Sequence, residues 1–348
     1  MTTYRKTNLE INLNNLSYNY NYFKTITNKA IFSIVKANAY GLGIKGVSKH
    51  LEELGSDYLG VATLDEALAL RSYNIKCPIL VMGYVSVSDT LVAKENNITL
   101  TVLSLAWAKQ LADKDINNLS LHIKVNTSMN RLGHNNLEEV KSTINLLQSK
   151  HNLEGIYTHY CCEDLEIVEK DFHNFKYIVE NLSNTFKWVH ASNSANALNF
   201  KEDFTNAVRV GIGLYGGLKS SKLKNVASLK SEVSLLRSLK VNETVSYEGI
   251  FRAKEDCIIA VIPVGYADGV LRADKNNKVY INNKSYPIVG NVCMDQLMIL
   301  VDDKVSLYDE VEIFGENIKI EDIAKNRDSI VYEVLSLISN RVNRLYIK

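Results

Sequence analysis

Short apolar segments alternate with longer amphipathic segments up to about residue 215. The apolar segments are rich in β-branched residues and predict eight strands, at residues 31–35, 58–62, 78–82, 98–102, 119–125, 154–158, 186–190 and 207–210. Between them apolar residues recur at helical spacing, as in segments 64–71, 136–150 and 164–182. Strands that alternate with helices in this way predict an α/β fold, a parallel (β/α)₈ TIM barrel, with a doubly wound sheet as the alternative.

The pattern changes after about residue 222, where strand-like segments dominate. They lie at residues 233–236, 245–251, 258–264, 278–281, 296–301 and 311–314. Asn282-Asn283 predicts a hairpin turn, and residues 330–338 predict one helix. We therefore expect two domains, the barrel over residues 1–222 and a C-terminal, mainly β domain over residues 223–348.

Composition and charge exclude several classes of protein. The 348 residues carry a net charge of +1, which is no electrostatic signature of binding to nucleic acid or to an anionic membrane. We find no apolar run as long as a membrane span and no signal-peptide core near the first residues. The five cysteines are odd in number and form no CxxC motif, which argues against a disulfide framework and a structural zinc site. We expect a cytoplasmic protein without a metal.

Polar residues lie directly after several of the predicted barrel strands. Lys36 follows the first strand, and residues 126–133 follow the fifth. His159 follows the sixth strand, residues 190–195 the seventh and residues 209–213 the eighth. The active sites of (β/α)₈ enzymes form from the loops at these strand ends. The placement of the polar residues therefore predicts an enzyme.

Lys36 and two of these loops indicate a cofactor. A lysine that ends a buried strand is costly unless it is paired, and lysine is the side chain best suited to form a Schiff base; the alternative is a lysine that reaches solvent. The loops after the last two strands often bind phosphate in barrels, and here they carry Ser192-Asn193-Ser194 and Gly211-Ile212-Gly213. A Gly-x-Gly alone is more typical of a tight turn. A phosphate site that faces a lysine predicts pyridoxal phosphate (PLP).

Several motifs together resemble those of the alanine racemase family. They are Val35-Lys36-Ala37-Asn38-Ala39-Tyr40-Gly41, Met129-Asn130-Arg131-Leu132-Gly133, His190-x-x-Asn193-Ser194, Arg209-Val210-Gly211, Gly265-Tyr266-Ala267-Asp268-Gly269 and Cys293-Met294-Asp295. The resemblance spans nearly the whole chain. It implies a PLP enzyme of fold type III that interconverts L- and D-alanine. It also implies a head-to-tail homodimer, in which each active site combines the barrel of one subunit with the β domain of the other.

The resemblance implies two catalytic bases on opposite faces of the cofactor. Lys36 is the residue that holds PLP and then acts as one acid/base. Tyr247, in Val245-Ser246-Tyr247-Glu248-Gly249, matches the second base, which comes from the partner subunit. Racemisation needs this arrangement, because one group removes the α-proton from one face and another delivers a proton to the other face. Since the chain has 19 tyrosines, a packed strand tyrosine is the alternative for Tyr247.

Other matched positions imply contacts with the cofactor. Arg209 faces the pyridine nitrogen, and because a guanidinium does not give up its proton, that nitrogen stays unprotonated. His159 supports Tyr247 or Arg209 through hydrogen bonds, with a histidine packed under a loop as the alternative. The positions that match the phosphate site are Tyr40, Ser194, Gly211 and Ile212.

A third set of matched positions implies contacts with the substrate. Arg131 binds the phenolic oxygen of PLP and the substrate carboxylate, helped by the backbone of Met294, with Asp295 in the same site. Lys124 matches a lysine that is often carbamylated in the family, and a carbamate would place an anion beside Arg131. The positions that match the substrate access path are Asp164, Tyr266 and Arg272.

Three positions depart from the family pattern. Asn126 replaces a usual aspartate, and Asn291 replaces a common arginine. Asn340 stands where many members have a tyrosine that contacts the phosphate, and the smaller amide leaves room for a hydroxymethyl group. The serine racemases linked to vancomycin resistance resemble this pattern, so serine is the alternative substrate. Those proteins carry a membrane domain ahead of the catalytic one, so this chain would then be an excised catalytic portion.

Two further function classes share parts of this plan. A fold-type III decarboxylase of basic amino acids has both domains, but it typically places an acidic residue where Arg209 stands and lacks the Tyr247 motif. A PLP carrier protein would need only the barrel, and the β domain argues against it. For a racemase, the D-amino acid would serve peptidoglycan synthesis, in general or in a resistance variant of it.

Overall fold

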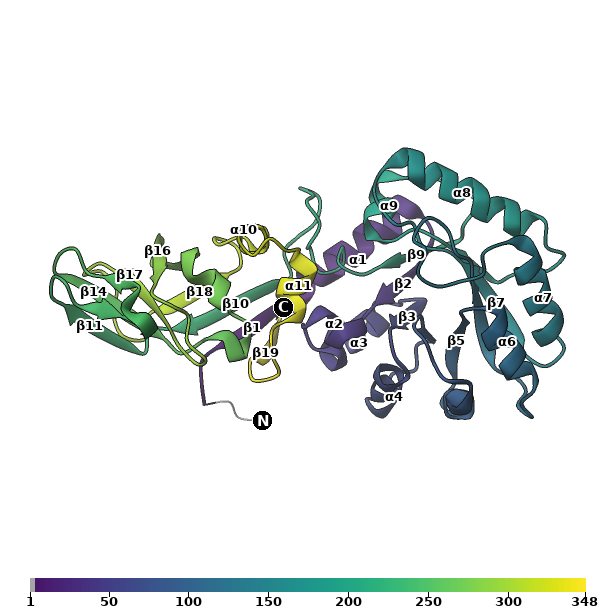
Figure 1. The fold of residues 1–348 in the computed structure, drawn as a ribbon, viewed down its shortest axis with the longest axis horizontal. Coiled ribbons are helices and arrows are strands. Elements are labelled where there is room, and N and C mark those ends of the chain that lie inside the picture. Colours follow the sequence, from purple (N-terminus) through teal and green to yellow (C-terminus); the bar gives the residue numbers. More distant parts are fainter. Residues whose placement is uncertain (1–3) are drawn as a thin grey trace.

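The computed structural model describes residues 4–348, which form two parts arranged along the long axis of the molecule (Figure 1). One part is a closed parallel barrel, and the other is a nine-stranded sheet. The predicted fold class is therefore confirmed. No helix within these residues is both long and apolar enough to cross a membrane.

All eight predicted barrel strands are present, each within two residues of its predicted position. They are β2 (Ala30–Ile34), β3 (Tyr58–Val61), β4 (Ile79–Val81), β5 (Ile98–Val102), β6 (Ser120–Lys124), β7 (Asn152–Tyr157), β8 (Trp188–His190) and β9 (Ala207–Val210). Neighbouring strands pair in parallel, and β9 closes the barrel against β2. Helices cover the outer face of such a barrel, so its strands read as nearly continuous apolar runs.

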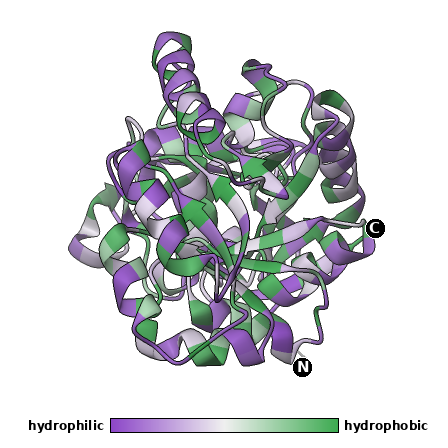
Figure 2. Ribbon diagram, turned by 90° about the vertical axis from the view of Figure 1, so that its right-hand side faces the viewer, coloured by the Kyte–Doolittle hydropathy of each residue, from purple (hydrophilic) through white to green (hydrophobic). Residues whose placement is uncertain are grey.

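Helices surround the barrel and alternate with its strands. They are α1 (Leu13–Thr27), α2 (Lys36–Tyr40), α3 (Ile44–Glu53), α4 (Leu64–Ser72), α5 (Thr90–Glu95), α6 (Leu105–Ala112), α7 (Leu137–Leu147), α8 (Leu165–Glu180) and α9 (Ser194–Asn199), with a 3₁₀ turn η1 (Val87–Asp89) before α5. The segments predicted as helices at 64–71, 136–150 and 164–182 correspond to α4, α7 and α8. Figure 2 shows the hydrophobic strands in the centre and many hydrophilic residues on the surrounding helices.

The large sheet of the second part has nine strands in the order β11-β14-β17-β16-β15-β18-β10-β1-β19. Their bounds are β1 (Asn8–Asn12), β10 (Ala227–Glu232), β11 (Leu235–Leu239), β14 (Cys257–Ile262), β15 (Lys278–Ile281), β16 (Lys284–Val289), β17 (Leu297–Val301), β18 (Glu310–Phe314) and β19 (Asn343–Ile347). The remaining elements of this part are the hairpin β12 (Thr244–Val245) and β13 (Phe251–Arg252), the 3₁₀ turns η2 (Tyr247–Gly249), η3 (Tyr266–Asp268) and η4 (Arg272–Asn276), and the helices α10 (Ile320–Asn326) and α11 (Val331–Ser336).

The sheet part confirms some local predictions and corrects one. Asn282 and Asn283 form the predicted turn between β15 and β16, with φ of 46° and 65°. Positive φ at both positions is what a two-residue hairpin turn requires. The continuous strand predicted at residues 245–251 is wrong, because Ser246 and Glu248 have φ of 67° and 64° and interrupt it between β12 and β13.

The first strand, β1, hydrogen-bonds within the sheet part rather than the barrel. It pairs antiparallel with β10 and parallel with β19, so both ends of the described chain meet in one sheet. The chain therefore begins in the sheet, builds the barrel and returns to the sheet. The boundary at residues 222 and 223 stays a prediction.

Two arginines join the last helices to the rest of the structure. Arg327, directly after α10, donates from Nε to Oδ1 of Asp274 at 2.7 Å, and both side chains are buried. Arg344 in β19 donates from Nη2 to the carbonyl oxygens of Gly41 at 2.8 Å and Ile338 at 2.7 Å. Since Gly41 ends α2, the contact between Arg344 and Gly41 connects the sheet part with the loop that carries Lys36. The helix α11 also packs against α2.

Candidate functional site

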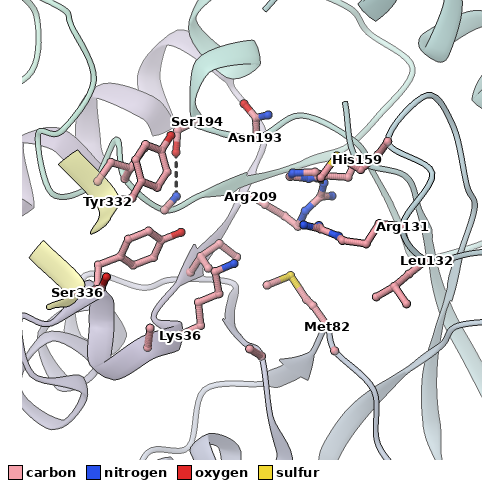
Figure 3. A pocket seen from close by; sticks show the side chains of 18 of the residues that line it. Lys36, Met82, Arg131, Leu132, His159, Asn193, Ser194, Arg209, Tyr332 and Ser336 are labelled. Carbon is pink, nitrogen blue, oxygen red and sulfur yellow. Dashed lines mark hydrogen bonds between the residues drawn. The ribbon is translucent and has the colours of Figure 1, made fainter. Parts of the chain in front are cut away.

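A cavity of about 630 Å³ lies at the carboxyl ends of the barrel strands (Figure 3). Figure 3 shows Arg131, His159 and Arg209 grouped on one side, Ser194 and Tyr332 on the other, and Lys36 between them. Nine of the residues predicted from the sequence line this cavity: Lys36, Tyr40, Lys124, Arg131, His159, Ser194, Arg209, Gly211 and Ile212. The roles assigned to them stay predictions.

The loop that carries Lys36 has an uncommon backbone conformation. Residues 37–40 all have positive φ, between 52° and 55°, which is a left-handed turn. For residues other than glycine this conformation costs roughly 1–2 kcal/mol each. The backbone N–H of Ala37 donates to Oε1 of Glu66 at 2.6 Å, and the N–H of Gly41 donates to the carbonyl of Ala37 at 2.9 Å. Such strain collects at functional sites, where the surrounding structure maintains it.

Lys36 lies in an environment that favours its neutral amine. Burial lowers the pKa of Lys36, and the positive charge of Arg131 lowers it further, while Glu66 acts in the opposite direction. Only a neutral amine is a nucleophile, so a lowered pKa leaves more of Lys36 reactive near neutral pH.

Ser194 forms a compact polar cradle with the loop after β9. Its Oγ accepts hydrogen bonds from the backbone N–H of Gly211 at 2.9 Å and of Gly213 at 3.2 Å. A Cβ on Gly211 would lie 2.5 Å from the hydroxyl oxygen of Tyr40, so the loop approaches Tyr40 only because position 211 has no side chain. Hydroxyls and closely spaced backbone N–H groups suit a phosphate.

Arg209 is a buried cation that is only 4% exposed. Its guanidinium donates to Nδ1 of His190 at 2.7 Å and to Nδ1 of His159 at 3.0 Å. It also donates to the carbonyl oxygens of Thr158 at 2.8 Å and Ala191 at 2.6 Å. Burial lowers the pKa of Arg209 to about 10, so it stays protonated at neutral pH. Within residues 4–348 no carboxylate forms an ion pair with it, which leaves its charge available to a ligand.

Lys124 ends β6 and lines the same cavity as Arg131. Its Nζ donates to the carbonyl of Val125 at 3.0 Å and lies 4.9 Å from the ring centre of Tyr157. Burial, together with Arg209 and Arg131, holds the pKa of Lys124 well below its usual range. These surroundings favour the neutral amine of Lys124 over a second cation, and the neutral amine is the form that reacts with carbon dioxide.

Four of the residues predicted for catalysis or substrate binding lie outside this cavity, as do the predicted access positions Asp164, Tyr266 and Arg272. Tyr247, Met294 and Asp295 line a separate hollow in the sheet part, which also includes Cys293. Tyr247 is 67% exposed there. Asn340 is exposed between α11 and β19, and its neighbour Arg341 forms an ion pair with Asp295 at 2.8 Å. One chain alone therefore does not bring Tyr247 or Asn340 to Lys36.

The cavity also contains residues that the sequence did not indicate. Tyr332, Glu333 and Ser336 of α11 close one side of it, and Met82 comes from the loop after β4. The helical pattern of residues 330–338 predicted α11 but not its position, because docking on α2 depends on tertiary contacts. The amphipathic pattern holds no signal for these cavity positions.

Comparisons with known proteins agree with this geometry. Residues 11–219 match the family described as alanine racemase, N-terminal domain, and residues 226–346 match alanine racemase, C-terminal domain. The chain belongs to the alanine racemase family. The predicted family is therefore confirmed.

Individual members of the alanine racemase family are similar over their full length. An alanine racemase from Staphylococcus epidermidis is 36% identical, with 99% of this chain and 95% of that protein covered. The solved structure of alanine racemase from Bacillus anthracis with bound L-Ala-P has a TM-score of 0.94 at 33% identity and covers 100% of this chain and 96% of that one. Histidine racemase from Leuconostoc mesenteroides has a TM-score of 0.92 at 26% identity, covering 100% and 99%.

Proposed function

We propose that this protein interconverts L- and D-alanine with PLP as its cofactor. The observation that carries the proposal is one cavity in a chain of the alanine racemase family. It combines a reactive lysine, a phosphate-type cradle and a buried arginine that has no carboxylate partner within residues 4–348. The full-length relatives named alanine racemase support the same substrate. The D-alanine would serve peptidoglycan synthesis in the cytoplasm.

The residues of the cavity fit PLP. Ser194 and the backbone of Gly211 and Ile212, with the hydroxyl of Tyr40, would hold the phosphate, because a cradle without a side chain at position 211 already exists there. Lys36 would hold the aldehyde carbon. Arg209 has no carboxylate partner among the described residues and would donate to the pyridine nitrogen.

Two groups of the protein would move the proton. When bound, PLP supplies an electron sink that makes the α-proton of an amino acid acidic. The amine of Lys36 would take or deliver this proton on one face of Cα, helped by a lowered pKa. The hydroxyl of Tyr247 of the partner subunit would do so on the other face. Transfer on opposite faces inverts the configuration.

Arg209, Arg131 and His159 would orient the reacting groups. Arg209 remains protonated and keeps the pyridine nitrogen unprotonated, which limits side reactions. Arg131 would bind the substrate carboxylate and the phenolic oxygen, with Met294 and Asp295 of the partner subunit nearby. His159 accepts from Arg209 at Nδ1, so its Nε2 carries the proton and can donate to a second group such as Tyr247.

A head-to-tail homodimer would complete the site. Tyr247, Met294 and Asp295 lie in an exposed hollow of the sheet part, away from the cavity that holds Lys36. A two-fold arrangement that places each hollow over the partner's cavity would form two equivalent sites, as closed symmetry requires.

Serine is the second candidate substrate, and Asn340 is the residue that favours it. This candidate rests on the resemblance at position 340 alone, because Asn340 is exposed and lines neither the cavity nor the hollow of the sheet part, whereas Tyr332 does line the cavity. A histidine racemase among the similar structures is named for a larger amino acid than either alanine or serine.

The decisive experiment compares kcat/KM for L-alanine and L-serine on purified protein with PLP. The D-product is measured with D-amino-acid oxidase, and Lys36→Ala serves as the inactive control. We expect a higher kcat/KM for alanine. A higher value for serine would select the second candidate, and the absence of racemisation of both amino acids would overturn the proposal.

A further inference from the structure

A chain of three buried side chains leads from the cavity into the barrel interior. Arg209 donates from Nη1 to Nδ1 of His190 at 2.7 Å. Nε2 of His190 lies 3.0 Å from Nδ1 of His122, which is in β6. Both histidines are 0% exposed, and His122 does not line the cavity. His190 therefore contacts Arg209 directly, and His122 contacts His190 from deeper in the barrel.

The positions of the ring protons on His190 and His122 follow from the hydrogen bond of Arg209 to His190. A guanidinium only donates, so Nδ1 of His190 must accept and carries no proton. Burial holds the pKa of His190 well below its usual range and lowers the pKa of His122 to about 3, so both rings are neutral. The one proton of His190 is then on Nε2 and is donated to Nδ1 of His122. The proton of His122 is in turn on its own Nε2.

The last N–H of this hydrogen-bonded series, on Nε2 of His122, has no hydrogen-bond partner within residues 4–348. A buried unsatisfied donor typically costs about 1–3 kcal/mol. This N–H is unsatisfied because His122 is the last residue of the series. Its Nδ1 can accept from His190 only when its own proton is on Nε2. The structure therefore satisfies the link to His190 and leaves Nε2 of His122 unpaired.

Packing holds both rings in this arrangement. The ring of Tyr157 stacks on His190, with 4.6 Å between ring centres and 6° between planes. The ring of Phe32 lies 4.9 Å from that of His190 and 6.2 Å from that of His122. A Cβ on Gly155 would lie 2.6 Å from the ring of His122, so this ring fits only against a glycine. This packing opposes a turn of either ring that would exchange its nitrogens.

We propose that His122 is a positioning residue, which holds His190 in its Nε2–H tautomer and thereby holds Arg209 toward the cavity. Without an acceptor at position 122, Arg209 alone would keep the proton of His190 on Nε2, and that buried N–H would have lost its acceptor. The other tautomer of His190 would direct an N–H at the N–H of Arg209, and two donors at 2.7 Å repel each other. The importance of this for catalysis rests on the proposed function, in which Arg209 contacts the PLP nitrogen.

The first experiment reads the tautomers directly, by NMR of ¹⁵N-histidine-labelled holoenzyme. Protonated and bare ring nitrogens differ in chemical shift. The proposal requires a protonated Nε2 and a bare Nδ1 in both His122 and His190, unchanged between pH 6 and pH 9. A protonated Nδ1 on His190 would overturn it. This readout does not depend on racemase activity, so it separates the failure of this inference from the failure of the proposed function.

Variants of His122 test the consequence. We expect His122→Leu to lower kcat for racemisation about tenfold, the effect of one lost buried hydrogen bond, with KM changed less than twofold. It should also change the absorbance spectrum of bound PLP. His122→Asn keeps an acceptor near the position of Nδ1 and should restore both the spectrum and most of kcat. Equal values for the Leu and Asn variants would overturn the proposal.

A matched control separates positioning from general stability. His151 is also buried and has an Nε2 without a partner among the described residues, but it contacts Leu119 just before the start of β6, at the end opposite the cavity. We expect His151→Leu to leave the PLP spectrum and the His190 tautomer unchanged. If His122→Leu does not fold, a protonated Nδ1 on His190 or His122 in the unaltered holoenzyme would still overturn the proposal.

Discussion

Lys36 and Tyr247, the two residues proposed to move the α-proton, lie in different hollows of the same chain. Lys36 lines the cavity of the barrel, whereas Tyr247 lies in the hollow of the sheet part and is 67% exposed. A two-base reaction needs both groups at one substrate carbon. The arrangement is therefore productive only if the tyrosine of one subunit reaches the lysine of another.

Mixing two inactive variants tests this arrangement. Lys36→Ala and Tyr247→Phe should each be nearly inactive alone. After subunit exchange, each mixed dimer contains one site with both Lys36 and Tyr247. Random pairing of equal amounts then restores about a quarter of the wild-type activity, because half of the dimers are mixed and half of their sites are intact.

Subunit exchange must be measured independently, for example by mass spectrometry of differently tagged chains. A sample of each variant treated alone in the same way is the control. Verified mixed dimers without activity would show that Lys36 and Tyr247 do not act across subunits.

The Tyr247→Phe variant also tests the division of work between the two bases. Phenylalanine keeps the ring and removes the proton, so only one face of the substrate should lose its acid/base. We expect exchange of the α-proton with D₂O to slow about a hundredfold or more for one enantiomer of alanine and much less for the other. The measurement is NMR of the α-position for each enantiomer. Equal slowing of both would argue against two bases.

Much of the fold is predictable because its barrel strands have a local signal. Parallel strands covered on both sides read as continuous apolar runs, and all eight were visible. The strands β1 and β19 have no such signal, since each is stabilised by a partner from the other end of the chain. Residues 245–251 resemble a strand in composition, but positive φ at Ser246 and Glu248 turns the chain there.

Some residues of the candidate site could likewise be located from the sequence, and others could not. Lys36, Ser194 and Arg209 could be located because barrel strands end at one rim, so residues far apart in the sequence share a cavity. Tyr332 was missed because it reaches the cavity through the packing of α11 on α2. His122 reads as an ordinary residue of an apolar strand, and only its distance of 3.0 Å from His190 relates it to Arg209.

Asn340→Tyr tests the interpretation of substrate choice. The resemblance to the family places position 340 beside the substrate side chain, although Asn340 lies outside the cavity of a single chain, and a tyrosine there would then take the room of a hydroxymethyl group. We expect the ratio of kcat/KM for serine to that for alanine to fall about tenfold, the effect of one misfitting group in a small pocket. Asn340→Gln, which keeps the amide, is the matched control. An unchanged ratio in the tyrosine variant would refute the assignment of position 340.

Removing Arg327 should destabilise the sheet part. Its guanidinium is the buried partner of Asp274, so Arg327→Met leaves that carboxylate uncompensated. We expect the free energy of unfolding to fall by about 3–5 kcal/mol, measured by urea titration. The control is Lys284→Met, which removes an exposed ion pair with Asp302 and should change stability little. Equal stabilities of the two variants would contradict the prediction.

Lys124 should carry a carbamate in the active enzyme. Its lowered pKa favours the neutral amine, whose nitrogen can attack carbon dioxide and release a proton, and the product anion would lie beside Arg131. We expect a ¹³C carbamate signal after incubation with ¹³C-bicarbonate, absent in Lys124→Ala. This variant should also raise KM for alanine about tenfold, because Arg131 loses a charged hydrogen-bond partner. Wild-type protein that shows no carbamate signal would exclude the modification.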